Sequence, residues 1–286
     1  MVQTNNWGVM SHLILRVFSV GVILAVFSLP CAVMAADEPV APEPAAPSAK
    51  TETLGLLLNL GYYQVRDHTL QNPHRHQGLL VGGSLDYERQ SGQLRHGLSL
   101  GFGYASLSDA YGLSAYSVLT GLRYEVQRNV RKIGAEGNWS LYAGGFLSYS
   151  ADVAIYPFTD EAHFYWLSSI SAGPAVTFER NVWDGALARI GLRAPLAAYV
   201  SRPPLERFYN NDKDKVGYIL SKINENMEFR SIDKHIAFDG EASLRFKLAG
   251  RIVETLGYRL SYTRDTAPVT TQILSHAVFI RISAQW

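Results

Sequence analysis

Residues 236–248 read IAFDGEASLRFKL, and successive side chains alternate between two kinds. One face of this segment carries no charge, whereas the other carries all of its acids and bases. Side chains of a β-strand point alternately to its two faces, so a period of two predicts a strand and not a helix. The uncharged face holds Ile236, Phe238, Gly240, Ala242, Leu244, Phe246 and Leu248, and the other face holds Asp239, Glu241, Ser243, Arg245 and Lys247.

The same period recurs from Thr51 to the end of the chain and divides it into ten expected strands. These are 54–66, 77–90, 94–106, 113–127, 138–151, 163–180, 186–200, 234–248, 252–265 and 272–286. An even strand number, with short turns at one end and long loops at the other, is typical of single-chain outer-membrane barrels. We therefore expect an all-β fold over 51–286, a ten-stranded antiparallel transmembrane up-and-down β-barrel with short periplasmic turns and long extracellular loops.

The placement of charge separates this barrel from a soluble β-sandwich, which is the alternative for alternating strands. A soluble sandwich carries its charges outside, whereas here the charged face also holds the Gly and Ser residues that suit a narrow interior. Six acids and eight bases lie on this face and can pair across the lumen. The expected lumen charge network contains Asp86, Glu88, Glu125, Glu179, Asp239, Glu241, Arg95, Arg123, Arg189, Arg193, Arg245, Lys247, Arg259 and Arg281.

Two prolines interrupt the pattern. Five of the seven prolines after Lys50 fall in the expected long loops, but Pro174 and Pro195 fall within expected strands. Proline has no N–H to donate to a strand ladder, so we expect a bulge or a locally broken ladder at both positions.

The first 35 residues have the pattern of a secretory signal peptide. A 13-residue apolar run over 17–29 follows Arg16, and the small-residue site 33–35 follows Pro30. This run is shorter than the roughly 20 apolar residues of a membrane-spanning helix. Residues 36–50, rich in proline and alanine, are expected to form an extended periplasmic linker.

Charge and cysteine content exclude several classes of protein. The chain has 26 basic and 25 acidic residues, and Arg16 is the one charged residue of the expected signal peptide. A neutral mature chain does not suit a nucleic-acid binder, which needs excess Lys and Arg. The single cysteine, Cys31, lies in the expected signal peptide, so the mature chain offers no thiol for disulfides, zinc or catalysis.

The C-terminus carries a resemblance to a known superfamily. Val278, Ile280 and Ile282 alternate up to the terminal Trp286. This pattern resembles the assembly signal of Gram-negative outer-membrane β-barrels, a last strand that ends in an aromatic residue. The resemblance implies a location in the outer membrane, insertion by the barrel-assembly machinery, and contact with outer-membrane lipids and lipopolysaccharide. We expect a monomer.

Ten strands favour a narrow lumen, because barrels of about eight strands are filled by side chains and those of about 16 hold an aqueous channel. We expect a non-enzymatic protein without a cofactor, either a narrow or loop-occluded porin-like channel or an adhesin- or receptor-like protein that presents its loops. In the long loop 201–233, four apolar residues at helical spacing predict a gate over Leu167 and Tyr199, against the alternative of an irregular loop. The gate residues are Val216, Ile219, Leu220 and Ile223.

Two weaker patterns suggest other chemistry. His68, His74 and His76 lie close together in the first long loop and could hold zinc or copper. Asp233 and His235 resemble half of the catalytic set of omptins, ten-stranded surface proteases that use a second acidic pair across the barrel mouth. That second pair is absent from its expected place. A surface protease that uses Asp233 and His235 is therefore the alternative to a non-enzymatic barrel.

Overall fold

The structure is a computed structural model that describes residues 50–67, 75–133, 139–156, 163–183, 185–203, 223–225, 227–267 and 269–286. The expected signal peptide and all but the last residue of the expected linker lie outside this described part. The strands are β1 (Thr51–Asp67), β2 (Arg75–Ser91), β3 (Leu94–Ser108), β4 (Ser114–Ile133), β5 (Trp139–Tyr156), β6 (His163–Trp183), β7 (Ala186–Arg193), β8 (Ala197–Ser201), β9 (Glu228–Ser231), β10 (His235–Ala249), β11 (Ile252–Asp265) and β12 (Thr271–Gln285).

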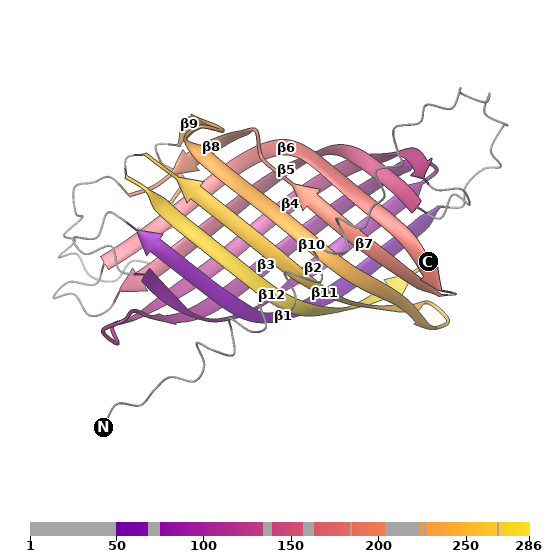
Figure 1. Ribbon diagram of the computed structural model, residues 1–286, viewed down its shortest axis with the longest axis horizontal. Helices are drawn as coiled ribbons and strands as arrows, with labels where there is room; N and C mark the ends of the chain where they lie inside the picture. The colour runs from indigo at the N-terminus through magenta and orange to yellow at the C-terminus, as the bar shows by residue number, and fades with distance from the viewer. Residues whose placement is uncertain are drawn as a thin grey trace. The chain divides into compact units, whose positions relative to one another are not determined.

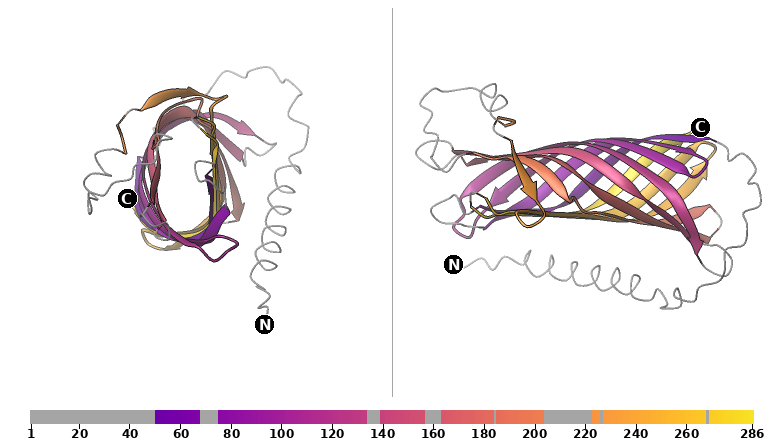
Figure 2. Two further views of the ribbon diagram at one scale, coloured as in Figure 1. Left: turned by 90° about the vertical axis from the view of Figure 1, so that its left-hand side faces the viewer. Right: turned by 90° about the horizontal axis from the view of Figure 1, so that it is seen from above.

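These strands form one antiparallel sheet that closes into a barrel (Figure 1; Figure 2). β1 pairs with β12 along its length, and β5 pairs with β6 to complete the ring. At the end where the chain stops, Glu52 and Trp286 exchange two backbone hydrogen bonds of 2.9 and 3.0 Å. The predicted ten-stranded barrel is confirmed: β7 and β8 together form one wall strand, and β9 is an additional short strand.

Tight turns join the strands at one end of the barrel, which we call the turn end; the opposite end is the loop end. Gly92, Gly185 and Gly250 adopt φ values of 60°, 77° and 54° in three of these turns. Such positive φ values favour glycine because other residues meet a steric penalty there. The short turns therefore lie where the sequence predicts them.

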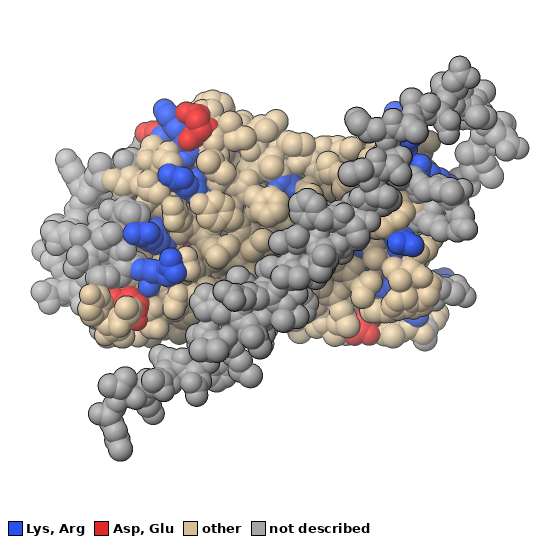
Figure 3. Space-filling model, in the orientation of Figure 1, with Lys and Arg blue, Asp and Glu red and all other residues tan. Residues whose placement is uncertain are grey.

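The outer surface of the barrel is an apolar belt. Leu56, Leu58 and Leu60 of β1 are 51–54% exposed, whereas Leu57 and Tyr63, on the opposite face of the same strand, are fully buried. Figure 3 shows the charged side chains of the visible wall gathered mainly toward its two ends. Outside the interruption at Pro195 described below, the closed ladder pairs the wall backbone groups without water, so this wall suits a hydrocarbon environment.

Among the described residues, no helix is long and apolar enough to cross a membrane.

One wall strand is interrupted at Pro195, as expected. The register of β6 is Ala175↔Arg193 with β7 but Ala172↔Ala197 with β8, a shift of one residue. The β7–β10 ladder ends at Arg193↔Asp239, and the described residues provide no ladder partner for residues 235–238 on the side of β8. Pro174 pairs normally with Gly145 of β5, so the irregularity lies on the side of β7 and β8.

The register shift at Pro195 is a β-bulge, and because of it one prediction from the sequence is wrong. An unbroken strand over 186–200 would place Tyr199 on the same face as Arg189 and Arg193, inside the lumen. The extra residue reverses the alternation, because a shift of one position moves every later side chain to the other face. Tyr199 is 52% exposed on the outside and packs against Phe229, while Ala198 and Val200 are buried.

This reversal can be tested by labelling single cysteines in a chain that carries Cys31→Ser. A fluorophore on Tyr199→Cys should be quenched by brominated lipids, because position 199 faces the bilayer. Ala198→Cys, one residue away, should label slowly and show little quenching. Strong quenching at 198 together with none at 199 would mean that the strand runs unbroken through Pro195.

Candidate functional site in the barrel lumen

A layer of paired charges crosses the lumen toward the turn end. Glu179 is its centre: Arg95 Nη2 donates to one carboxylate oxygen at 2.7 Å and Arg189 Nε to the other at 2.6 Å. Arg189 also donates to Glu88 at 2.8 Å, and Arg245 lies 3.8 Å from Glu88. Glu179 and Arg95 come from β6 and β3, which are not neighbours in the wall, so this pair spans the lumen.

A second group of ion pairs continues the layer. Arg193 Nε donates to Glu125 at 2.5 Å, and Arg259 Nη2 donates to Glu241 at 2.9 Å. Arg281 lies 2.8 Å from Asp86 and 3.7 Å from Glu241. We call the whole set the charged layer: Asp86, Glu88, Arg95, Arg123, Glu125, Glu179, Arg189, Arg193, Asp239, Glu241, Arg245, Arg259 and Arg281.

The charged layer contains the expected network except Lys247, which is exposed at the rim of the turn end. Thirteen of the fourteen expected residues therefore lie in the layer, and eleven of these have a salt bridge. Arg123 and Asp239 have neither a salt bridge nor a side-chain hydrogen bond with another described residue.

Next to the charged layer, toward the loop end, lies a cavity of about 290 Å³, here called the chamber. Hydroxyl groups dominate its polar lining, and several are paired across neighbouring strands. Ser148 and Ser171 lie 2.9 Å apart, as do Ser150 and Ser169. Arg123, Asp239 and Arg259 lie where the chamber meets the charged layer, and His235 and Pro195 also line it.

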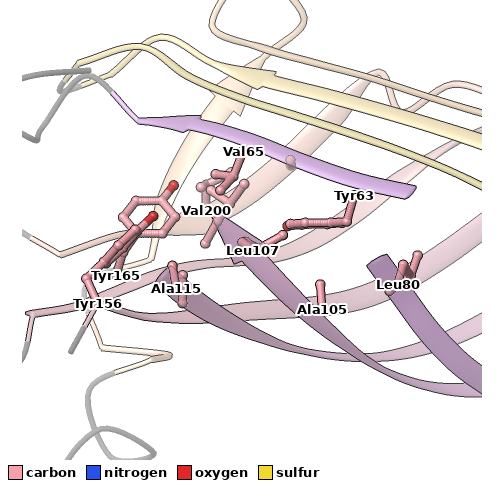
Figure 4. Close-up of a cluster of buried hydrophobic side chains, with 12 residues drawn as sticks. Tyr63, Val65, Leu80, Ala105, Leu107, Ala115, Tyr156, Tyr165 and Val200 are labelled. Atoms are coloured by element: carbon pink, nitrogen blue, oxygen red, sulfur yellow. The ribbon is translucent and has the colours of Figure 1, made fainter. Parts of the chain in front are cut away.

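A packed apolar layer fills the lumen at the loop end (Figure 4). Tyr63 and Val65 are at most 1% exposed, and Tyr156 and Tyr165 are 5% and 3% exposed. Asp152 lies within this layer and accepts hydrogen bonds from the hydroxyls of Tyr63 and Ser117. We call this set the apolar layer: Tyr63, Val65, Leu80, Ala105, Leu107, Ala115, Ala154, Tyr156, Tyr165, Leu167, Ala198 and Val200.

The residues of the protease hypothesis have separate partners. Asp233 lies in an exposed turn and accepts a hydrogen bond from Ser231. His235 is buried, and its Nδ1 atom lies 3.6 Å from Oδ1 of the fully buried Asp265. Arg202 also binds Asp265, at 3.2 Å, so the acid beside His235 is Asp265, contributed by β11. Sequence spacing could not identify this partner, because it depends on the β10–β11 register.

The expected metal site is only partly described. His68 and His74 lie outside the described residues, and His76 is buried with its ring edge-on to Tyr156 at 5.0 Å. The described part of the chain contains no group of three or more His, Cys, Asp or Glu side chains that could hold a metal ion.

Of the four residues of the expected loop gate, only Ile223 lies among the described residues. Ile223 is buried against Ala151 and Trp166, which face outward from β5 and β6, and the adjacent Asn224 accepts a hydrogen bond from Ser168 at 2.8 Å. Ile223 therefore packs on the outer wall and not on the apolar layer. The other three gate residues, Val216, Ile219 and Leu220, lie outside the described residues.

The residues of the expected assembly signal lie on the outer face of β12. Val278, Ile280 and Ile282 are 49%, 37% and 58% exposed, and Trp286 is 51% exposed at the turn end. They alternate with Phe279, whose side chain is buried in the lumen, as the sequence pattern predicts.

Comparisons with solved structures find barrels of similar length. Outer membrane protease OmpT from Escherichia coli is 6% identical, with a TM-score of 0.47, over 84% of this chain and 97% of that chain. The translocator domain of autotransporter NalP from Neisseria meningitidis is 10% identical, with a TM-score of 0.42, over 83% and 88%. An outer membrane channel from Pseudomonas putida F1 is 10% identical, with a TM-score of 0.35, over 87% and 100%.

No protein-family model matches the chain, and no curated protein matches it in sequence. Because the sequence identities and TM-scores are low, the functions of these proteins are not assigned to this chain.

The charged layer should contribute strongly to stability. Glu179→Gln leaves Arg95 and Arg189 without their shared carboxylate and should lower the free energy of unfolding by about 3–5 kcal/mol, as for other broken buried pairs. Glu52→Gln removes a more exposed pair with Arg89 at 3.7 Å and should cost less than about 1 kcal/mol. Urea titration of the folded protein in lipid bilayers measures both values. Equal values would contradict a central role for Glu179.

Proposed function

We propose that this Gram-negative outer-membrane β-barrel is a narrow channel for small polar solutes, closed at rest by its own lumen side chains. The observation that carries the proposal is the chamber of about 290 Å³, which lies between the charged layer and the apolar layer. A lumen filled completely by side chains would instead favour a barrel that serves only as a scaffold for loops.

The lining of the chamber supports passage of polar solutes. Serine and threonine hydroxyls can both donate and accept hydrogen bonds, so they can replace part of a solute's hydration shell. The arginines and carboxylates below the chamber exclude large or apolar solutes, because displacing their ion pairs would leave buried charges uncompensated. These features favour small hydrophilic molecules and ions over the substrates of a wide general porin.

The apolar layer is the better candidate for the barrier that opens. Hydrophobic constrictions in channels block conduction by excluding water, and they open when their side chains move apart. In the charged layer, in contrast, Glu88, Glu179 and Glu241 each bind two or more arginines. A change at the loop end can therefore admit water to the chamber without breaking the network around Glu179.

Planar-bilayer recording of a paired variant tests this function. Tyr156→Ala with Tyr165→Ala removes two rings from the apolar layer and should raise single-channel conductance several-fold over a small wild-type value. Tyr104→Ala with Tyr116→Ala removes two stacked rings from the outer face and serves as the matched control, with wild-type conductance expected.

Gel mobility before and after heating establishes that each variant is folded. A folded lumen variant that conducts no better than a non-conducting wild type would contradict the channel and favour a role based on the loops. A large wild-type conductance would contradict closure at rest.

A further inference from the structure

The charged layer has one more base than acid, and Arg123 is its one arginine without an ion pair to a described residue. The layer contains seven arginines and six carboxylates. The other six arginines each have an acidic partner within 4 Å, but Arg123 has no ion pair or hydrogen bond with any described residue. The acid without an ion pair, Asp239, lies near Arg123 but not in salt-bridge contact with it.

Most charged groups near Arg123 already form ion pairs with other residues. Glu125 attracts Arg123 electrostatically but is already bound by Arg193, and Arg259 is bound by Glu241. Arg193 and Arg259 both lie near enough to repel the Arg123 guanidinium. Three guanidinium groups therefore lie close together, with Asp239 as the one nearby carboxylate that has no other ion pair.

Arg123 lies at the floor of the chamber, since it lines both that cavity and a smaller cavity of about 100 Å³ within the charged layer. Its neighbours across the wall are Ser99 of β3 and Ser148 of β5, both on the lumen face. Ser99 donates to Asp86 at 2.6 Å, and Ser148 is shared with Ser171. Arg123 therefore lies between two lumen-facing serines of the wall, and all three residues line the chamber.

We propose that Arg123 binds a small inorganic anion, from chloride to phosphate in size, at the floor of the chamber. A guanidinium carries five N–H donors, and here none is used by a described protein group. A charge without a partner is costly where the dielectric is lower than in bulk water, as between closely packed wall side chains, and an anion that receives these donors lowers that cost. If the barrel conducts as proposed above, the same site makes it select anions over cations, as rings of basic side chains do in other pores.

Anion binding is tested without any measurement of conductance. The ³⁵Cl nuclear magnetic resonance line of chloride should broaden on addition of the folded wild-type barrel in detergent, and added phosphate should reverse the broadening by competition. Arg123→Gln should abolish most of this effect. Lys247→Gln loses the same charge at the exposed rim of the turn end and should retain the wild-type effect.

The alternative is that Arg123 is neutralised through water by Asp239. In that case the wild type and Arg123→Gln would broaden the chloride line equally, and the anion site would be wrong. Asp239→Asn provides a second readout, since removal of the competing carboxylate should strengthen chloride binding at Arg123. Weaker chloride binding in folded Asp239→Asn would also overturn the proposal.

Reversal potentials in a salt gradient test the consequence for selectivity. The wild type, or the more conductive Tyr156→Ala, Tyr165→Ala variant, should favour chloride over potassium, and adding Arg123→Gln should shift the preference toward potassium. Chloride binding in a barrel that never conducts would refute the channel but keep the anion site. If the barrel conducts but its chloride binding does not depend on Arg123, the anion site is refuted and the channel is kept.

Discussion

The backbone ladder that joins β1 to β12 is the constraint on which the other features of the barrel depend. In hydrocarbon an unpaired N–H or C=O group costs several kcal/mol, so a sheet that spans the membrane has to close. Closure fixes the direction of every wall side chain. The apolar set must contact lipid, and every charged residue of the alternate set must be accommodated within a narrow interior. The ion pairs around Glu179 are a result of this geometry.

The charged layer and the apolar layer are held together by different kinds of interaction. In the charged layer Glu88, Glu179 and Glu241 are each shared by two or more arginines, so moving one of these arginines disturbs another pair, as with Arg189 and Arg95 at Glu179. The apolar layer is held by burial and shape, and its contacts are weak individually and non-directional. The lumen therefore combines a rigid ionic half with a half that can rearrange by small displacements.

Much of this structure could be predicted because the strand period acts locally. The alternation of side chains predicts the ten wall strands. It also predicts that residues such as Glu88 and Arg193 face the lumen, because the direction of each side chain in a strand follows from that of its neighbours. Features that depend on three-dimensional register could not be predicted. Asp265 faces His235 only through the pairing of β10 with β11, and Tyr199 lies outside because one extra residue at Pro195 reverses the alternation. The outer-wall position of Ile223 likewise depends on how a loop folds back.

The interrupted strand at Pro195 also makes the wall mechanically unequal. From β1 to β6 each strand pairs with the next along nearly its whole length, so this part of the wall should resist bending more strongly. Among the described residues, β8 and β10 form no ladder beyond the Arg193–Asp239 pair, and the short paired strands β8 and β9 are joined to the rest of the sheet through β6. We therefore expect lateral pressure from the bilayer to displace this strand pair more easily than the other described strands, next to Pro195 and His235, which line the chamber.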